Sequence, residues 1–107
     1  HLCARLRGSL RLIPVVDVLY LQAEEKYVVV HHTGGADLIE DSLKALELEF
    51  PERFLRIHRN CLVARSELRE LRRGNDGQVH ALLKRSADAL EISRRCLPQI
   101  RQLLKHL

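Results

Sequence analysis

The chain has 107 residues, a formal net charge of +4 and a hydrophobic fraction of 46%. At this length and composition, one globular domain with its own core is expected. Because the sequence has no Trp or Met and only two Phe and two Tyr, that core must be aliphatic. We expect no membrane-spanning segment or signal peptide, since no apolar run approaches the ~20 residues that cross a bilayer.

The three cysteines indicate a reducing compartment. Cys3, Cys61 and Cys96 lie far apart in the sequence. Their odd number, without a CxxC spacing, argues against both a disulfide framework and a thiolate metal site. We therefore expect a cytoplasmic protein without a metal ion or other cofactor. Because residue 1 is not Met, we also expect a fragment of a longer protein.

Charge is distributed unevenly along the chain. Residues 37–52 hold six acidic residues and one Lys, a balance of −5, whereas residues 53–73 hold seven Arg and two Glu, a balance of +5. Residues 84–107 hold six Lys or Arg and two acidic residues, a balance of +4. This segregation suggests that one basic face meets a polyanion such as nucleic acid. A solvated surface with a chance excess of Arg explains the charge equally well.

The first 40 residues alternate between apolar and polar side chains in the manner of short β-strands. Turn-forming or charged residues at 8–9, 24–26 and 33–35 separate the runs. The predicted strands are 2–6, 10–15, 16–23, 27–32 and 36–40. Successive strands joined by such short turns indicate antiparallel hairpins.

A short helix is predicted over residues 42–50. Asp41 or Ser42 is placed as its N-cap, and Pro51 ends it. Its apolar residues recur at helical spacing: Leu43, Leu46 and Phe50. The acidic residues between them give this helix an acidic outer face.

Residues 54–65, FLRIHRNCLVAR, mix core-forming residues with hydrogen-bond donors. In an extended segment Ile57 faces the core, while Arg56 and His58 face outward. The adjacent polar pair Arg59-Asn60 interrupts this alternation and predicts a bend. Residues 61–64 are then expected to return to the core as a turn or short helix.

This bend holds Arg59 on a rigid segment of backbone if the flanking residues are buried. Rigid presentation is what a bidentate contact from a guanidinium to guanine O6 and N7 requires. Asn60 fits two roles equally well, a side-chain cap on the turn or a contact to a base.

After this segment the pattern returns to strands, predicted at 67–73, 78–84 and 89–93. A C-terminal helix is expected from about Pro98, with a tighter lead-in over residues 93–97. Its apolar stripe consists of Ile100, Leu103, Leu104 and Leu107. We expect this stripe to pack on the protein's own sheet rather than to dock a partner helix. The total of seven or eight short strands and two helices indicates a mainly β protein with antiparallel sheets.

Two further groups of donors are candidates for a binding site. Arg94 and Arg95 lie at the entrance to the C-terminal helix, where free backbone N–H groups favour a phosphate and positive charge opposes the helix dipole. The alternative is that both are solvated surface residues. Lys26, in the hairpin loop before Tyr27, could reach a phosphate or a base, although a loop Lys without such a role is the more frequent case.

The sequence does not support an enzyme. His31 and His32 are adjacent on a strand, so they point to opposite faces and cannot chelate one metal ion together. Cys61 with His58 could suggest a thiol nucleophile, but a small buried Cys beside a surface His is the more frequent arrangement. The metalloprotease, hydrolase and phosphate-loop motifs are absent from the sequence.

Four segments in order carry a family resemblance: IPVVDVLYLQAEEKYVVVHH, DSLKALELEF, FLRIHRNCLVAR and EISRR, the last followed by a basic helix. Over nearly the whole chain they resemble the LytTR DNA-binding domain at the C-terminus of AlgR/LytR-type bacterial response regulators. Within this family, RIHRNCLVAR and SLKALELEF are most similar to the AlgR type. Two positions depart from the family pattern, with Ala64 where Asn is usual and Cys96 where Tyr or His is common.

The resemblance implies an elongated fold of antiparallel β-sheets, with a short helix after the fourth or fifth strand and a C-terminal helix. It also implies that loops, rather than a recognition helix, enter successive major grooves of double-stranded DNA. Carried over position by position, the DNA-binding residues are Lys26, Tyr27, Arg56, His58, Arg59, Asn60, Ser93, Arg94 and Arg95. Arg59 and Arg95 are the foremost candidates for base contacts.

The implied function is sequence-specific transcription regulation in a two-component system. The chain would be the output domain of a response regulator whose N-terminal receiver domain lies outside this fragment. Direct repeats in a promoter are the implied partner, and a homodimer on the DNA is compatible with them. The alternative is a β-rich protein-interaction module with a basic face. Binding to one duplex requires Lys26, Arg59 and Arg95 to lie on a common side of the molecule.

Overall fold

Three antiparallel β-sheets and two α-helices make up the chain in the computed structural model, which describes residues 1–6 and 8–105. The elements in chain order are β1 (Leu2–Leu6), β2 (Ser9–Ile13), η1 (Val15–Asp17), β3 (Val18–Ala23), β4 (Val28–His32), β5 (Gly35–Ile39), α1 (Leu43–Glu49), β6 (Phe54–His58), β7 (Cys61–Ala64), η2 (Arg65–Glu67), β8 (Leu68–Arg73), β9 (Val79–Leu83), β10 (Ala89–Ile92) and α2 (Leu97–Leu104). Here η1 and η2 are single 3-10 turns.

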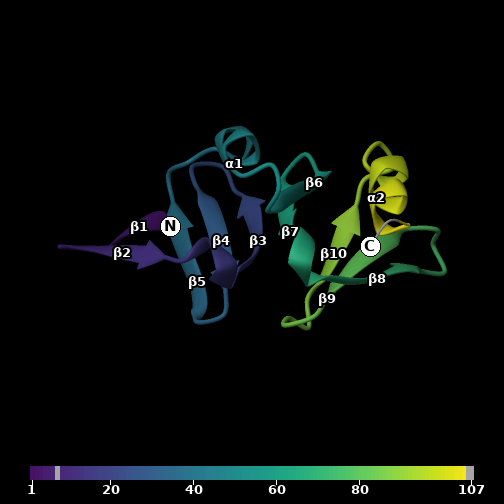
Figure 1. Ribbon diagram of the computed structural model, residues 1–107, viewed down its shortest axis with the longest axis horizontal. Coiled ribbons are helices and arrows are strands. Elements are labelled where there is room, and N and C mark those ends of the chain that lie inside the picture. The colour runs from purple at the N-terminus through teal and green to yellow at the C-terminus, as the bar shows by residue number, and fades with distance from the viewer. Residues whose placement is uncertain (7, 106–107) are drawn as a thin grey trace.

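The body is elongated, with principal extents of 46 × 27 × 24 Å. Figure 1 shows the β1–β2 hairpin at one end and α2 with the sheet of β8, β9 and β10 at the other. The helix α1 follows the fifth strand, and α2 is the last element. The predicted fold, mainly β with elongated antiparallel sheets and these two helices, is confirmed.

A five-stranded sheet in the order β5-β4-β3-β7-β6 forms the centre of the molecule. Leu21 of β3 pairs with Val30 of β4 on one side and with Leu62 of β7 on the other. The hairpin of β6 and β7 is therefore joined to β3, although the helix α1 and two strands separate them in the sequence. This long-range pairing decides where the residues between β6 and β7 lie.

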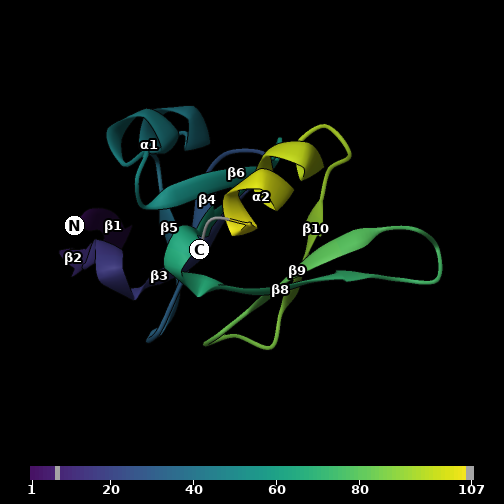
Figure 2. The ribbon, with the colours of Figure 1, turned by 45° about the vertical axis from the view of Figure 1, so that its right-hand side comes forward.

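Apolar side chains cover both faces of the central sheet. One cluster lies between the sheet, α1 and the β1–β2 hairpin, and it includes Leu21 and Leu62. The second lies between the opposite face, the three-stranded sheet and α2, and it includes Ile57, Val63 and Ile100. Figure 2 shows α2 next to β10 and away from the β1–β2 hairpin, as this division requires. The core is aliphatic, as the composition predicts.

Residues 61–64, predicted as a turn or short helix, form the strand β7 instead. The strand lies between β3 and β6, and all four of its residues are buried. A strand that is covered on both faces has no polar alternation, so the run CLVA carries no period-2 signal. With β7 included, the described residues contain ten strands rather than seven or eight.

The strand predicted at 16–23 begins two residues late. Val16 and Asp17 belong to η1, in which the Asp17 N–H donates to the Pro14 carbonyl at 2.9 Å. Val16 is consequently 57% exposed instead of joining the apolar face of the sheet. Pro14 thus separates β2 from β3 through a 3-10 turn.

The helix α1 begins and ends close to the predicted positions. The Ser42 Oγ accepts a hydrogen bond from the Ala45 N–H at 3.1 Å, so Ser42 rather than Asp41 is the N-cap. Phe50 is the C-cap, immediately before Pro51. The buried residues Leu43 and Leu46 attach the helix to the first apolar cluster.

The helix α2 carries Pro98 in its first turn, as predicted. Ile100 is completely shielded from solvent, and Leu103 and Leu104 pack against the second apolar cluster. These three residues of the predicted stripe are therefore used inside the molecule, and Leu107 lies outside the described residues. Within the described part of the chain, no helix is long and apolar enough to cross a membrane.

We predict that Leu62→Ala lowers the free energy of unfolding by about 2–5 kcal/mol, because it opens a cavity in a fully shielded site of the central sheet. Leu48→Ala is the matched control, since Leu48 is 73% exposed and should change stability by less than about 0.5 kcal/mol. Urea denaturation followed by circular dichroism measures both. Equal effects of the two substitutions would contradict the assignment of β7 to the core.

Candidate nucleic-acid interface

Three turns that carry predicted site residues meet at one edge of the molecule. They are the Lys26 loop (residues 24–27), the Arg59 turn (residues 59–60) and the Arg95 turn (residues 93–96). The Ala23 N–H donates to the Asn60 carbonyl at 2.8 Å, which joins the first two turns. The Ser93 N–H donates to the Ile57 carbonyl at 2.9 Å, which joins the third to the end of β6. These two hydrogen bonds make the three turns neighbours in the fold.

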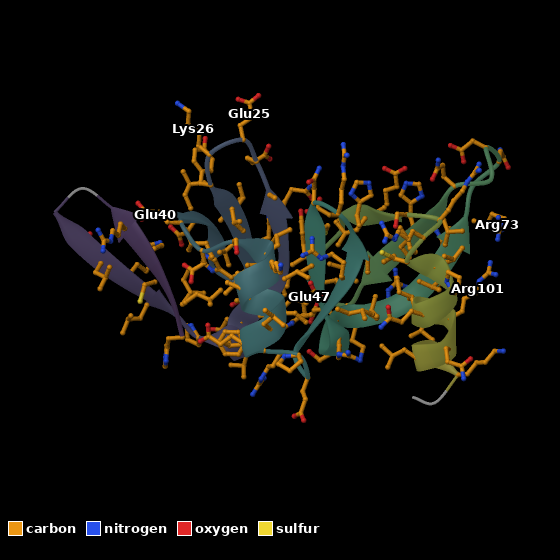
Figure 3. All side chains as sticks on the ribbon, turned by 90° about the horizontal axis from the view of Figure 1, so that it is seen from above. Glu25, Lys26, Glu40, Glu47, Arg73 and Arg101 are labelled. Atoms are coloured by element: carbon orange, nitrogen blue, oxygen red, sulfur yellow. The ribbon has the colours of Figure 1, made fainter. Side chains whose placement is uncertain are left out.

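The Lys26 loop is a closed hairpin loop between β3 and β4. The Glu24 N–H donates to the Tyr27 carbonyl at 2.8 Å, which fixes the ends of the loop. Glu25 and Lys26 are exposed, and Figure 3 shows both at the tip, pointing away from the body. Glu24 is exposed as well, so the loop presents one cation beside two carboxylates.

Hydrogen bonds to two side chains hold the Arg59 turn. The Arg56 Nη1 donates to the Arg59 carbonyl at 2.6 Å, and the Asn60 N–H donates to the His58 Nδ1 at 3.3 Å. This second bond makes Nδ1 an acceptor, so a neutral His58 carries its proton on Nε2. The Arg59 side chain is exposed above this braced backbone.

The two roles left open for Asn60 are partly resolved. Asn60 bonds through its backbone, with the N–H donating to the His58 Nδ1 and the carbonyl accepting from the Ala23 N–H. Backbone groups and the His58 ring thus fasten the turn. A contact from the Asn60 amide to a base stays a prediction.

Ser93 caps the Arg95 turn. Its Oγ accepts from the Cys96 N–H at 3.2 Å, and its carbonyl accepts from the N–H groups of Cys96 and Leu97, each at 3.1 Å. Ser93 therefore shapes the entrance to α2, and its hydroxyl is already engaged. Arg94 and Arg95 are exposed on this turn.

Five of the nine predicted site residues line one open hollow of about 570 Å³, together with Cys96. The lining residues are Arg56, His58, Arg59, Ser93, Arg95 and Cys96. Three guanidinium groups and one imidazole surround this space, and among the described residues that line it none is a carboxylate. Such a surface attracts a polyanion and supplies donors for phosphate oxygens or base edges.

The other predicted residues lie beside this hollow. Lys26 and Asn60 belong to the adjacent turns, and Arg94 is exposed next to Arg95. Tyr27 is separated from them, because its side chain lines a different hollow of about 360 Å³ with Cys3 and Leu38, near β1 and β5. The structure does not bring Tyr27 together with Arg59 and Arg95.

A residue that the sequence analysis missed is Glu47 on α1. Its Oε1 accepts from the Arg56 Nε at 3.2 Å and from the Arg56 Nη2 at 3.0 Å. The sequence places Glu47 only on the acidic outer face of the predicted helix. No pattern within residues 42–58 indicates that α1 packs beside β6. A residue pair of opposite charge nine positions apart was the only available signal.

The β9–β10 connection is fastened to the central sheet by Tyr20. Its hydroxyl donates to the Asp88 Oδ2 at 2.6 Å, and burial together with the Asp88 carboxylate raises the pKa of Tyr20, so the donor is retained at neutral pH. His31 stacks on Tyr20 with ring centroids 4.1 Å apart. Burial lowers the pKa of His31, which favours its neutral form. This tie holds β10, and with it the Arg95 turn, against the sheet.

Cys61 does not fit a nucleophile. It is only 3% exposed, and burial raises the pKa of its thiol to about 12, against a smaller opposite effect of Arg56. His31 and His32 also have separate partners, since His32 Nε2 bonds to the Asp37 Oδ2 at 2.8 Å. Within the described residues, no group of three or more His, Cys, Asp or Glu is placed to hold a metal ion.

The sequence and the fold match a known class of DNA-binding domain. The family model for the LytTr DNA-binding domain matches residues 8–105. The chain belongs to the LytTR DNA-binding domain family, which confirms the resemblance carried by its four motifs.

Two curated relatives support this assignment. The chain is 44% identical over 108 aligned positions to the positive alginate biosynthesis regulatory protein of Pseudomonas aeruginosa, covering 100% of this chain and 44% of the relative. It is 30% identical over 93 residues to the CO-responsive transcriptional regulator RcoM of Rhodospirillum rubrum, covering 86% of this chain and 39% of the relative. The chain thus spans less than half the length of either relative.

A solved structure supports the fold independently of close sequence similarity. It is described as the LytTr DNA-binding domain of a methyl-accepting/DNA response regulator from Bacillus cereus. The TM-score is 0.84 at 19% identity, with 96% of this chain and 94% of that chain covered. At this identity the likeness concerns the fold alone.

We predict that Cys61 in the folded protein reacts with a disulfide reagent at least ~100-fold more slowly than Cys3, because the reactive thiolate becomes tenfold rarer for each unit by which the pKa rises. Cys3 is exposed and serves as the internal reference. Mass spectrometry after timed labelling assigns each site, and Cys3→Ser confirms the fast one. In denaturant the two rates should converge. Equal rates in the folded state would overturn the assignment of Cys61 as a buried, protonated thiol.

Proposed function

We propose that this domain binds double-stranded DNA sequence-specifically through its three adjacent turns and acts as the output domain of a transcription regulator. The observation that carries the proposal is the shared hollow, in which Arg59 and Arg95 come together from turns far apart in the sequence. Membership of a family of DNA-binding domains supports it. The names of the two relatives, a regulatory protein and a transcriptional regulator, favour the same role.

In the proposed complex the turns enter successive major grooves along one side of the duplex. Arg59 and Arg95 read base edges, since a guanidinium can donate in parallel to guanine O6 and N7. Lys26 and Arg94 contact phosphates, and Arg94 lies beside the N-terminus of α2, where the helix dipole also favours an anion. His58 contributes an outward Nε2–H donor.

The domain is proposed to work within a longer bacterial response regulator in the cytoplasm. An N-terminal receiver domain would regulate it, promoter direct repeats would be its sites, and two copies would occupy them as a homodimer. The length of the relatives, of which this chain covers 44% and 39%, leaves room for such a regulatory part. We further propose that the domain acts by binding alone and needs no cofactor.

A protein-interaction module with a basic face is the competing function. Its docking element was the apolar stripe of α2, but Ile100, Leu103 and Leu104 pack against the protein's own core. The stripe therefore offers a partner helix little apolar surface. Selection of bound duplexes from a random pool decides between the two functions, because only a sequence-specific DNA-binding domain enriches a common sequence.

We predict that Arg59→Ala lowers the ratio of affinities for the selected duplex and a scrambled duplex by roughly 5- to 150-fold, because a bidentate contact contributes about 1–3 kcal/mol of discrimination. Arg95→Ala should act similarly. Fluorescence anisotropy with both duplexes measures the ratio.

Arg53→Ala is the matched control for charge. It removes the same charge, but Arg53 lies just before β6, at the end of that strand opposite Arg59. The control should keep the wild-type ratio. If Arg59→Ala kept it too, Arg59 would not be a base-reading residue.

We predict that Lys26→Ala weakens binding to both duplexes by a similar factor and lowers the slope of log K against log salt by about 1, as expected when one phosphate contact is lost. Lys84→Ala is the control, because Lys84 follows β9 and its N–H donates to the Glu67 carbonyl, at the end of β7 away from the Arg59 turn. A salt titration of each variant measures the slope. An unchanged slope for Lys26→Ala would exclude Lys26 from the interface.

A further inference from the structure

The side chain of Arg56 is largely committed to other protein groups. Its Nε and Nη2 donate to the Glu47 Oε1 at 3.2 and 3.0 Å, and its Nη1 donates to the Arg59 carbonyl at 2.6 Å. Three of the five N–H donors of a guanidinium are thus occupied. The side chain is 24% exposed, so it is more shielded than Arg59 and Arg95, which line the same hollow and are exposed.

The backbone of the Arg59 turn needs this support. Two-residue hairpin loops normally place residues at positive φ, which matches the twist of the flanking strands. In the described chain all residues at positive φ are glycines, so Arg59 and Asn60 both have negative φ. The pairing of β6 with β7 also shifts register between Arg56 and His58. An irregular turn of this kind depends on side-chain hydrogen bonds for a single conformation.

Glu47 fixes the direction from which Arg56 reaches the turn. It projects from α1 on the side of Arg56, as its position in Figure 3 shows. Because both contacts to Glu47 use the Nε/Nη2 edge of the guanidinium, the remaining Nη1 is aimed at the Arg59 carbonyl. Hydrogen bonds between charged partners are short and directional, so they orient the group that they join.

We propose that Arg56 is a positioning residue, and that the pair Glu47–Arg56 holds the Arg59 turn in the conformation that lets Arg59 read a base. This rests on the proposed DNA-binding function and reassigns Arg56 from a direct DNA contact. It makes the acidic residue Glu47, on a helix outside the three turns proposed to contact DNA, a determinant of sequence discrimination. A guanidinium that only contacted phosphate would need no carboxylate partner on α1.

Glu47→Ala separates positioning from electrostatics, because the two predict different changes in binding. Removing a negative charge near a polyanion strengthens binding to every duplex if charge alone matters. If Glu47 positions the turn, the affinity ratio between selected and scrambled duplexes falls roughly tenfold, within the range of one bidentate contact. Glu49→Ala, an exposed residue on the same helix, is the matched control for charge and should keep the wild-type ratio.

Glu47→Gln completes the set, because it removes the same charge but keeps an acceptor oxygen for Arg56. Its ratio should lie closer to wild type than that of Glu47→Ala. The proposal is overturned if Glu47→Ala keeps the wild-type ratio, or if Glu49→Ala loses as much. Thermal unfolding of each variant shows that the fold is intact.

A second measurement needs no DNA. Hydrogen exchange of the Asn60 amide, which is bonded to His58 in the braced turn, should be at least about tenfold faster in Glu47→Ala and unchanged in Glu49→Ala. If the exchange rate of the Asn60 amide is unchanged in Glu47→Ala, the Glu47–Arg56 pair does not hold the Arg59 turn, whatever the DNA result. If instead the wild-type protein fails to discriminate between duplexes while the exchange rate responds as expected, the proposed function is wrong. The support of the Arg59 turn by Glu47 and Arg56 is then still confirmed.

Discussion

Ile57, Leu62 and Val63 are completely shielded from solvent, and apolar neighbours lie on both faces of the sheet that carries them. Removing this surface from water stabilises the central strands, and close packing leaves them little room to shift. The Arg59 turn is attached at both ends to these strands. A side chain on such a rigid turn loses less conformational entropy when it binds, which favours a directional contact.

The arginines of this chain divide according to their hydrogen bonds. Some serve the fold: Arg85 bonds to the buried Glu67 and to the Val16 carbonyl, and Arg65 bonds to the Pro51 carbonyl. Arg59, Arg94 and Arg95 instead are exposed on two adjacent turns. The excess of positive charge therefore overstates the free cationic surface of the described residues, and of these two groups the second is placed to meet a polyanion.

Both helices are engaged in other ways, which supports the proposal that the turns carry the binding surface. The stripe of α2 packs into the second core, and α1 presents Glu47 and Glu49 where a groove-binding helix would need neutral or basic residues. A phosphate backbone repels such a face. The turns at the edge of the central sheet are joined to one another by backbone hydrogen bonds and remain open to a ligand. In this arrangement α1 supports the surface from behind.

The amino-acid sequence by itself determined the hairpins of the first 40 residues, the start of α1 to within one residue, the position of Pro98 in α2 and the bend at Arg59-Asn60, because local alternation and turn chemistry specify them. With the four family motifs it also indicated DNA binding through three turns. Only the tertiary structure decided that CLVA is a central strand, that Tyr27 and Arg59 line different hollows, and that Arg56 is bound to Glu47. These features follow from pairing and packing between segments far apart in the chain, and no periodicity within a single segment records them.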